Sequence, residues 1–235
     1  MSAAVPTFEC VKIEREGPVT FVILNRPEKR NAMSPQLHLD MCEALDWAEE
    51  DEQTKVVVLT GAGGNFCAGQ DLKLYFRGTE DDPKMRNRAR RAAHSWRWDK
   101  LSRHTKPTIA MVHGYCFGGA FGPLAACDIC VTADEATFGL SEVNWGILPG
   151  GIISKVFSDL CNSRDALFYA MTGRTFDGRK AAQMGVANMS VPLASLKEEV
   201  RTIARELLQK GPAVLAYTKQ AVKAVKDLPM EMAWE

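Results

Sequence analysis

The segment Gly118-Gly-Ala-Phe-Gly122 decides the fold, because it joins a strand-like run to an apolar helix. The run before it, Thr108-Ile-Ala-Met-Val-His-Gly114, is typical of a buried strand, and Pro123-Leu-Ala-Ala-Cys127 after it is typical of a short helix. The first N–H groups of a helix have no partner within that helix. We therefore expect free backbone donors at this turn, where they can hold a developing negative charge.

A second glycine turn, Cys67-Ala-Gly-Gln-Asp-Leu72, follows another strand-like run, Lys55-Val-Val-Val-Leu-Thr60. Glycines also punctuate ordinary connections between strands and helices. Two N–H donors from two separate turns, however, suit the oxyanion of a thioester carbonyl. One carboxylate is suitably placed to act there as acid or base: Glu142, within Phe138-Gly-Leu-Ser-Glu-Val-Asn-Trp-Gly146. The alternative role for Glu142 is that of a surface carboxylate at a strand end.

The order of apolar segments predicts an α/β fold with a mainly parallel sheet. Ser34 is a helix N-cap with Pro35 at the first helical position. A strand, glycine turn, helix and strand recur between Lys55 and Ala133, which is the βαβ pattern of a parallel sheet. The predicted elements are strands Phe8–Arg15 and Val19–Leu24, a helix to Glu50 that buries Leu37, Met41, Leu45 and Ala48, a helix Gly178–Met184 capped by Asp177, a strand Ala187–Val191, and helices Leu196–Gln209 and Ala213–Lys226.

The composition argues against several classes of partner. The 29 basic and 29 acidic side chains cancel, so no overall charge directs the chain to nucleic acid or to an anionic membrane. No apolar run approaches the ~18 residues that cross a bilayer, and the first ten residues do not form a secretory signal. The seven cysteines are scattered among apolar runs, which is typical of reduced thiols in a cytoplasmic protein.

The glycine turns, the surroundings of Glu142 and the segment Asn25-Arg-Pro-Glu-Lys-Arg-Asn-Ala32 resemble the crotonase (enoyl-CoA hydratase) superfamily over essentially the whole chain. The resemblance implies a crotonase-type spiral of ββα units with a CoA-thioester site at residues 1–192, and a C-terminal helical trimerisation region at residues 193–235. It implies a homotrimer or a dimer of trimers, an acyl-CoA substrate, no metal, and no cofactor besides the coenzyme A of the substrate. Many members carry a second catalytic glutamate at the position of Gly122, and its absence narrows the chemistry.

Several stretches resemble hydroxycinnamoyl-CoA hydratase-lyase (feruloyl-CoA hydratase/aldolase). Gly122 replaces a small polar residue of that family, and Gln70 replaces an apolar one. We expect the family's second phenol-binding tyrosine, which comes from its C-terminal segment, to lie beyond Glu235. The stretches that carry the resemblance are Val22–Ser34, Asp71–Arg77, Cys116–Gly119 and Ala133–Gly146.

The resemblance implies a role for each residue of the site. The backbone N–H groups of Gln70 and Gly119 form the oxyanion hole, Glu142 is the acid/base, and Tyr75 engages the phenol of a 4-hydroxycinnamoyl group. The further implied contacts are Gly118, Gly122, Trp145 and Gly146 for the acyl group, and Lys29, Ala68, Asp71 and Leu72 for coenzyme A.

One carboxylate and one oxyanion hole suffice for two successive steps. Glu142 can take a proton from water and deliver it to the α-carbon while the hole holds the thioester enolate. The β-hydroxy thioester can then undergo retro-aldol cleavage. Together with this chemistry, the resemblance implies hydration of feruloyl-CoA or coumaroyl-CoA and cleavage of the product to an aromatic aldehyde (vanillin from feruloyl-CoA) and acetyl-CoA. The alternative is an enoyl-CoA hydratase or isomerase that acts on another acyl-CoA with Glu142 alone.

Other patterns favour structural explanations. The basic segment Lys84–Arg103 suggests an RNA-binding crotonase relative, but Met85, Ala89, Ala92 and Trp96 form an apolar helical stripe, so we interpret the charges as a solvated face. Cys127-Asp-Ile-Cys130 has metal-ligand spacing without a second ligand pair. Phe66 replaces the last glycine of a dinucleotide fingerprint, and the histidines show no ligand spacing.

Overall fold

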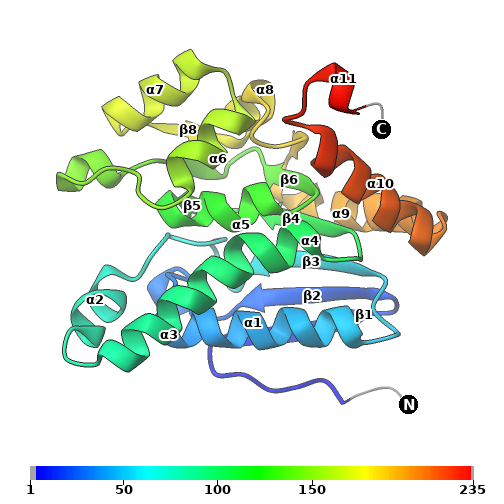
Figure 1. The fold of residues 1–235 in the computed structure, drawn as a ribbon, viewed down its shortest axis with the longest axis horizontal. Helices are drawn as coiled ribbons and strands as arrows, with labels where there is room; N and C mark the ends of the chain where they lie inside the picture. The colour runs from blue at the N-terminus through cyan, green and yellow to red at the C-terminus, as the bar shows by residue number, and fades with distance from the viewer. Residues whose placement is uncertain (1–3, 234–235) are drawn as a thin grey trace.

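The structure, a computed structural model, describes residues 4–233. Its core is a six-stranded sheet in the order β1-β2-β3-β4-β6-β9 (Figure 1). Only the β1–β2 pair of this sheet is antiparallel. Strands β2, β3 and β4 are buried along their whole length, as expected for parallel strands covered on both faces. The strands are β1 (Val11–Glu16), β2 (Val19–Leu24), β3 (Val56–Gly61), β4 (Thr108–Val112), β6 (Ile129–Ala133) and β9 (Met189–Val191).

A second, three-stranded sheet consists of β5 (Tyr115–Phe117), β7 (Thr137–Gly139) and β8 (Thr175–Asp177). The chain leaves the first sheet at Gly114, which has a φ of +55° and no room for a side chain, because a Cβ would stand 2.0 Å from the Gly64 carbonyl oxygen. The sequence predicted that the run from Thr108 leads directly into the glycine turn. The structure instead inserts β5, so the turn begins in the second sheet.

Helix α1 (Pro35–Glu50) confirms the prediction made from its capping residue. The Ser34 hydroxyl accepts a hydrogen bond from the Leu37 N–H at 3.2 Å, which satisfies one free donor of the first turn. The predicted apolar face is buried, and α1 lies between the sheet and α3 (Figure 1). The remaining helices are α2 (Leu72–Tyr75), α3 (Pro83–His94), α4 (Leu101–Arg103), α5 (Phe121–Ala126), α6 (Ile153–Leu160), α7 (Ser163–Thr172), α8 (Gly178–Met184), α9 (Leu193–Leu208), α10 (Pro212–Val225) and α11 (Met230–Ala233).

The first strand begins later than the predicted Phe8. The Cys10 N–H donates to the Asp40 carboxylate at 2.7 Å, so this part of the chain is bound to α1 before it pairs with β2. Strand β1 therefore starts at Val11. The predicted strand Ala187–Val191 is likewise shorter, Met189–Val191, and the helix after it starts at Leu193 rather than Leu196.

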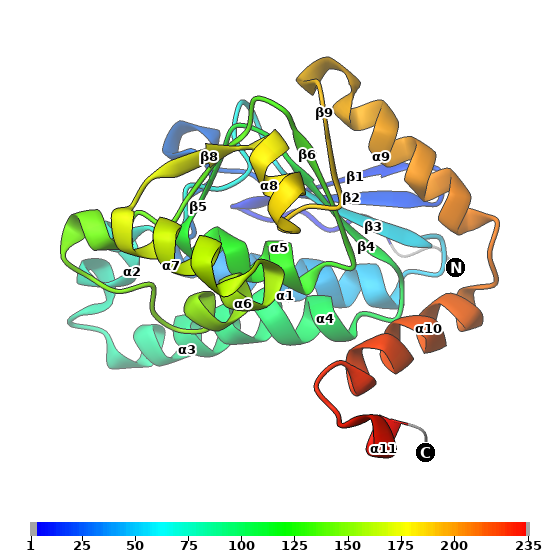
Figure 2. The ribbon, with the colours of Figure 1, turned by 90° about the horizontal axis from the view of Figure 1, so that it is seen from above.

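The C-terminal helices are held in two different ways. Helix α9 buries Leu196, Val200 and Ile203 against the sheet, whereas α10 and α11 bury no side chain and extend away from α9 (Figure 2). Lysines tie α10 to the body: Lys219 is 2.8 Å from the Asp128 carboxylate. The division of the chain at residues 192 and 193 stays a prediction.

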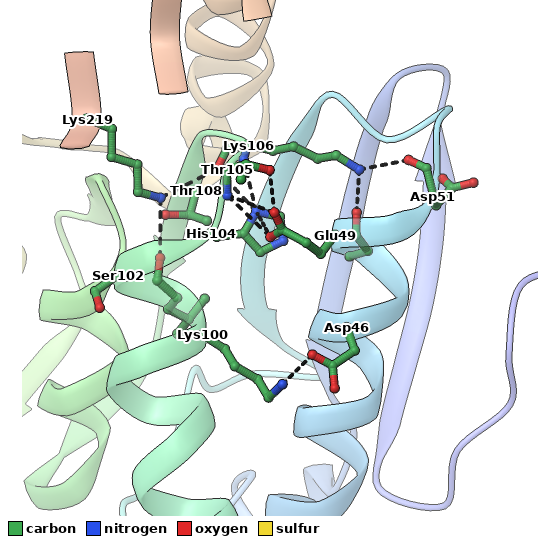
Figure 3. A network of polar contacts seen from close by, with 12 residues as sticks. Asp46, Glu49, Asp51, Lys100, Ser102, His104, Thr105, Lys106, Thr108 and Lys219 are labelled. Carbon is green, nitrogen blue, oxygen red and sulfur yellow. Dashed lines mark hydrogen bonds and ion pairs between the residues drawn. The ribbon is translucent and has the colours of Figure 1, made fainter. Parts of the chain in front are cut away.

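Figure 3 shows how the start of β4 is joined to α1 next to α10. The Lys106 ammonium donates to the carbonyls of Ala48 and Asp51 at 2.6 and 2.8 Å. The Thr105 N–H donates to the Glu49 carboxylate at 3.0 Å, and Lys219 donates to the Lys106 carbonyl at 3.5 Å. These contacts fix the strand that leads, through β5, to the glycine turn at Gly118. No helix among residues 4–233 has the length and apolarity of a membrane span.

Candidate active site

The two glycine turns lie side by side because their backbones pair. The Cys67 N–H donates to the Tyr115 carbonyl at 2.8 Å, and the Phe117 N–H donates to the Cys67 carbonyl at 3.1 Å. The approach is closest at Gly69, whose φ is +92° and where a Cβ would stand 2.7 Å from the Phe117 carbonyl oxygen. Any larger residue there would push the turns apart.

The segment that follows β2 supports the turn Cys67–Leu72. Asn31 has a φ of +56°, and its side-chain amide donates to the carbonyls of Ala62 and Asn65 at 2.9 and 2.7 Å. The Ala68 N–H donates to the Arg30 carbonyl at 2.9 Å. The segment that carries the family resemblance therefore has a structural task, which is to hold the turn that contains Gln70.

The amide groups of Gln70 and Gly119 converge. A Cβ on Gly119 would stand 3.6 Å from the Gln70 amide nitrogen. Gly119 lies in the first turn of the short helix Gly118–Ala120, so its N–H has no partner within that helix. No hydrogen bond among the described residues uses either N–H. The arrangement offers two free donors to one oxygen atom, as an oxyanion hole requires.

The Gln70 side chain anchors this turn rather than entering the cavity. Its amide nitrogen donates to the Met33 carbonyl at 2.8 Å, and its oxygen lies 3.3 Å from His38 Nε2. The Trp96 indole donates to His38 Nδ1 at 2.8 Å, so the proton of the neutral imidazole is on Nε2, facing Gln70. Burial lowers the pKa of His38 to about 3, which keeps the ring neutral.

Glu142 faces the turn that begins at Gly118. A Cβ on Gly118 would stand 2.7 Å from Glu142 Oε1, and the φ of Gly118 is +49°. Glu142 Oε2 is buried without a hydrogen-bond partner among the described residues. Burial raises the pKa of this carboxyl group above its ordinary value, because it disfavours the charged form. A carboxyl group in this state is suited to exchange protons.

Both features face one cavity of about 890 Å³. Tyr75 at the end of α2 lines it, and the Tyr75 ring packs edge-to-face on His38 at 5.4 Å between ring centroids. Trp145 lies at the rim, 72% exposed. The predicted site residues that line the cavity are Ala68, Gln70, Leu72, Tyr75, Gly118, Gly119, Glu142 and Trp145.

Two predicted acyl contacts lie outside the lining. Gly122 is buried in α5, and a Cβ there would meet Ile152 Cδ1 at 3.6 Å and Arg97 Cβ at 3.7 Å. Gly146 ends the turn Glu142–Trp145 with a φ of +70° and has no neighbour that a Cβ would meet. Their roles in substrate binding stay predictions.

Two predicted CoA contacts, Asp71 and Lys29, also lie outside the cavity lining. Asp71 caps α2 by accepting from the Leu74 N–H at 2.9 Å and pairs with Arg26 at 3.0 Å, which gives it a structural task. Lys29 is exposed, and the basic residue that lines the cavity in this region is its neighbour Arg30. The CoA-binding roles of Asp71 and Lys29 stay predictions.

The sequence reasoning missed Arg97, which it assigned to a solvated face. Arg97 lies on a π-helical turn, Ser95–Lys100, and its guanidinium lines the cavity. The rest of the basic segment agrees with the prediction, since Ala89 and Trp96 are buried and Arg88 and Arg90 are exposed.

The cysteine pair Cys127 and Cys130 is buried, and burial raises the pKa of the Cys127 thiol to about 12. All seven cysteines are free thiols. Among residues 4–233 no group of histidine, cysteine or acidic side chains could hold a metal ion.

Comparison with known proteins agrees with this geometry. Residues 14–233 match the family model of enoyl-CoA hydratase/isomerase. A hydroxycinnamoyl-CoA hydratase-lyase of Pseudomonas fluorescens is 51% identical over 232 residues, covering 98% of this chain and 84% of that protein. A putative enoyl-CoA hydratase of Thermus thermophilus is 32% identical, covering 94% of this chain and 86% of that protein.

Among solved structures, an enoyl-CoA hydratase of Bacillus anthracis superposes with a TM-score of 0.87 at 27% identity, covering 96% of this chain and 87% of that one. The crotonase fold predicted from the sequence is thereby confirmed. The chain belongs to the enoyl-CoA hydratase/isomerase family.

Proposed function

We propose that the protein hydrates the double bond of a 4-hydroxycinnamoyl-CoA ester and cleaves the product to an aromatic aldehyde and acetyl-CoA. The observation that carries the proposal is one half-buried carboxylate, Glu142, which faces the same cavity as two converging N–H donors. The 51% identity to a hydroxycinnamoyl-CoA hydratase-lyase supports the choice of substrate. Feruloyl-CoA and coumaroyl-CoA are the substrates we expect, and vanillin is the aldehyde from feruloyl-CoA.

In the hydration step Glu142 acts on water. Its carboxylate takes a proton from the water molecule that attacks the β-carbon, and it then delivers a proton to the α-carbon. Negative charge moves onto the thioester oxygen between these events, and the N–H groups of Gln70 and Gly119 hold it there. The raised pKa of Glu142 favours both directions of transfer, because the donor and acceptor forms then lie closer in free energy.

In the cleavage step the same groups act again. Glu142 removes the proton of the β-hydroxyl group, the bond between the α- and β-carbons breaks, and the electron pair forms the enolate of acetyl-CoA. The oxyanion hole receives that enolate, and a proton then returns to the α-carbon. No metal and no cofactor besides the coenzyme A of the substrate takes part.

Tyr75 supports a ring with a para-hydroxyl group. It lines the cavity at the end of α2. A hydrogen bond to the substrate phenol would help electrons move from the ring toward the β-carbon. That movement compensates for the missing second carboxylate at Gly122.

We also propose that the protein assembles as a trimer or a dimer of trimers. Helices α10 and α11 bury none of their side chains, yet they expose a series of large apolar residues, which a neighbouring subunit would cover. The free thiols fit a reducing compartment such as the cytoplasm. The exposed apolar residues are Val214, Tyr217, Val222, Val225, Leu228, Met230 and Met232.

One assay tests the reaction: the protein is incubated with feruloyl-CoA, cinnamoyl-CoA and crotonyl-CoA, and aromatic aldehyde is measured. Aldehyde from feruloyl-CoA but not from cinnamoyl-CoA supports the phenol-assisted route, and Tyr75→Phe should then lower the rate. Rapid hydration of crotonyl-CoA with no aldehyde from either aromatic ester would favour the simpler hydratase. That second candidate rests on the general match to the enoyl-CoA hydratase/isomerase family.

A further inference from the structure

Arg97 carries a positive charge without an anionic partner. Its side chain is anchored to the preceding turn of the helix, because its Nε donates to the Ala93 carbonyl at 2.8 Å. No carboxylate among residues 4–233 lies within ion-pair distance of the guanidinium. The titratable groups near it are neutral, since burial holds the pKa of His38 at about 3 and raises the pKa of the Cys67 thiol to about 12.

The guanidinium lies beside the two N–H donors. Arg97 Nη1 is 3.3 Å from the point where a Cβ on Gly119 would stand, and the Gln70 amide nitrogen is 3.6 Å from the same point. Gly122 packs on the stem of Arg97, since a Cβ on Gly122 would be in ordinary contact with Arg97 Cβ at 3.7 Å.

A half-buried arginine without a partner is unfavourable for folding alone. Unpaired charges and π-helical turns both occur preferentially where they serve function. The proposed reaction creates negative charge in this cavity twice, once during hydration and once during cleavage. In both steps the charge is on the thioester oxygen.

We propose that Arg97 is a further catalytic residue, whose guanidinium stabilises the negative charge on the thioester oxygen together with the N–H groups of Gln70 and Gly119. The choice of substrate in this inference rests on the proposed function. The charge acts at short range from a half-buried side chain, where such an interaction is stronger than in bulk water. Because no carboxylate of the described residues pairs with Arg97, its charge stays available to the substrate.

A competing role is suggested by a second cavity of about 530 Å³ that Arg97 also lines, together with Tyr75, Arg86 and Arg90. There the guanidinium would hold the ionised phenol of the ring instead. The two roles differ in the atom that bears the charge, so they are distinguished by a substrate whose phenol cannot ionise.

The test uses the absorption spectra of bound feruloyl-CoA and 4-methoxycinnamoyl-CoA, recorded directly after mixing with the Glu142→Gln protein, in which turnover is slow. Such conjugated thioesters absorb at longer wavelength when their carbonyl oxygen is polarised. We expect a red shift on binding for both esters, and we expect Arg97→Gln to reduce it for both. Arg97→Lys should retain part of it, and Arg88→Gln, an exposed arginine of α3, should retain all of it.

Kinetics give the second readout. In the otherwise unchanged protein, Arg97→Gln should lower kcat about 10- to 100-fold with a smaller change in KM. An unchanged shift for 4-methoxycinnamoyl-CoA in Arg97→Gln would overturn the proposal. A loss confined to feruloyl-CoA would overturn it in favour of the phenol role. If wild-type protein turns over no feruloyl-CoA, the proposed function fails, while the spectra of the methoxy ester still report on Arg97.

Discussion

Replacing Gly118 by alanine should disable the catalytic carboxylate without removing it. The new methyl group would stand 2.7 Å from Glu142 Oε1, so the carboxylate must move by about 0.7 Å to reach ordinary van der Waals contact. A misplacement of about 1 Å can cost about 100-fold in rate. We therefore expect kcat for feruloyl-CoA to fall about 10- to 100-fold, with KM nearly unchanged.

The same substitution strains the backbone, because alanine at a φ of +49° costs about 1–2 kcal/mol. For a chain of this size that lowers Tm by roughly 2–8 °C. Gly17→Ala is the matched control: Gly17 has a φ of +59° and no neighbour within 4 Å of a new Cβ, so it should lose similar stability and keep full activity. Wild-type kcat in Gly118→Ala, measured alongside thermal unfolding, would contradict the placement of Glu142.

Three further predictions follow from the site and the C-terminal helices. Glu142→Gln should lower turnover by about two to four orders of magnitude. Because burial raises the pKa of Glu142, ionisation of this carboxyl destabilises the folded wild type, so the variant should have a higher Tm than wild type at pH 8 and no advantage at pH 4. If the variant and wild type had equal Tm values at both pH 8 and pH 4, the burial argument would be refuted. His38→Leu should lower kcat about tenfold by freeing the Gln70 side chain. The dependence of kcat on pH should stay unchanged between pH 6 and 9, since the imidazole is already neutral, and the loss of an ionisation from that range would show that His38 titrates. Asp128→Asn should speed amide hydrogen exchange in α10, because Lys219 loses its carboxylate partner. The control Lys223→Gln replaces a side chain that is 37% exposed, so it should have a smaller effect. Equal exchange in wild type and both variants would refute the attachment of α10 through Asp128.

Local signals explain why parts of the fold were predictable. Ser34 and Pro35 define the start of α1 by their own chemistry, and β2 and β3 are apolar throughout. The second sheet was missed because β5 and β7 have three residues each, which is too short for an alternating pattern to be recognised.

Site residues that belong to a sequence motif could be predicted, whereas residues placed by contacts between distant parts of the chain could not. Glu142 and the glycine turns were identified from their sequence surroundings. His38 was not, because its partners Trp96 and Gln70 lie 58 and 32 residues away in the chain. Arg97 lies four residues after the buried Ala93, at the edge of an apolar stripe. We predicted that it faces solvent only because it is charged.

The pairing of the two glycine turns has a consequence for how this enzyme could change over evolution. The two N–H donors of the oxyanion hole belong to the backbone, and the Cys67–Tyr115 and Phe117–Cys67 hydrogen bonds that align them are backbone bonds as well. Substitutions at lining positions such as Leu72 or Trp145 can therefore alter which acyl groups react, while enolate binding by the backbone survives. New activities can therefore arise in this fold by single side-chain substitutions, and no variant along the way has to lose the ability to bind an enolate.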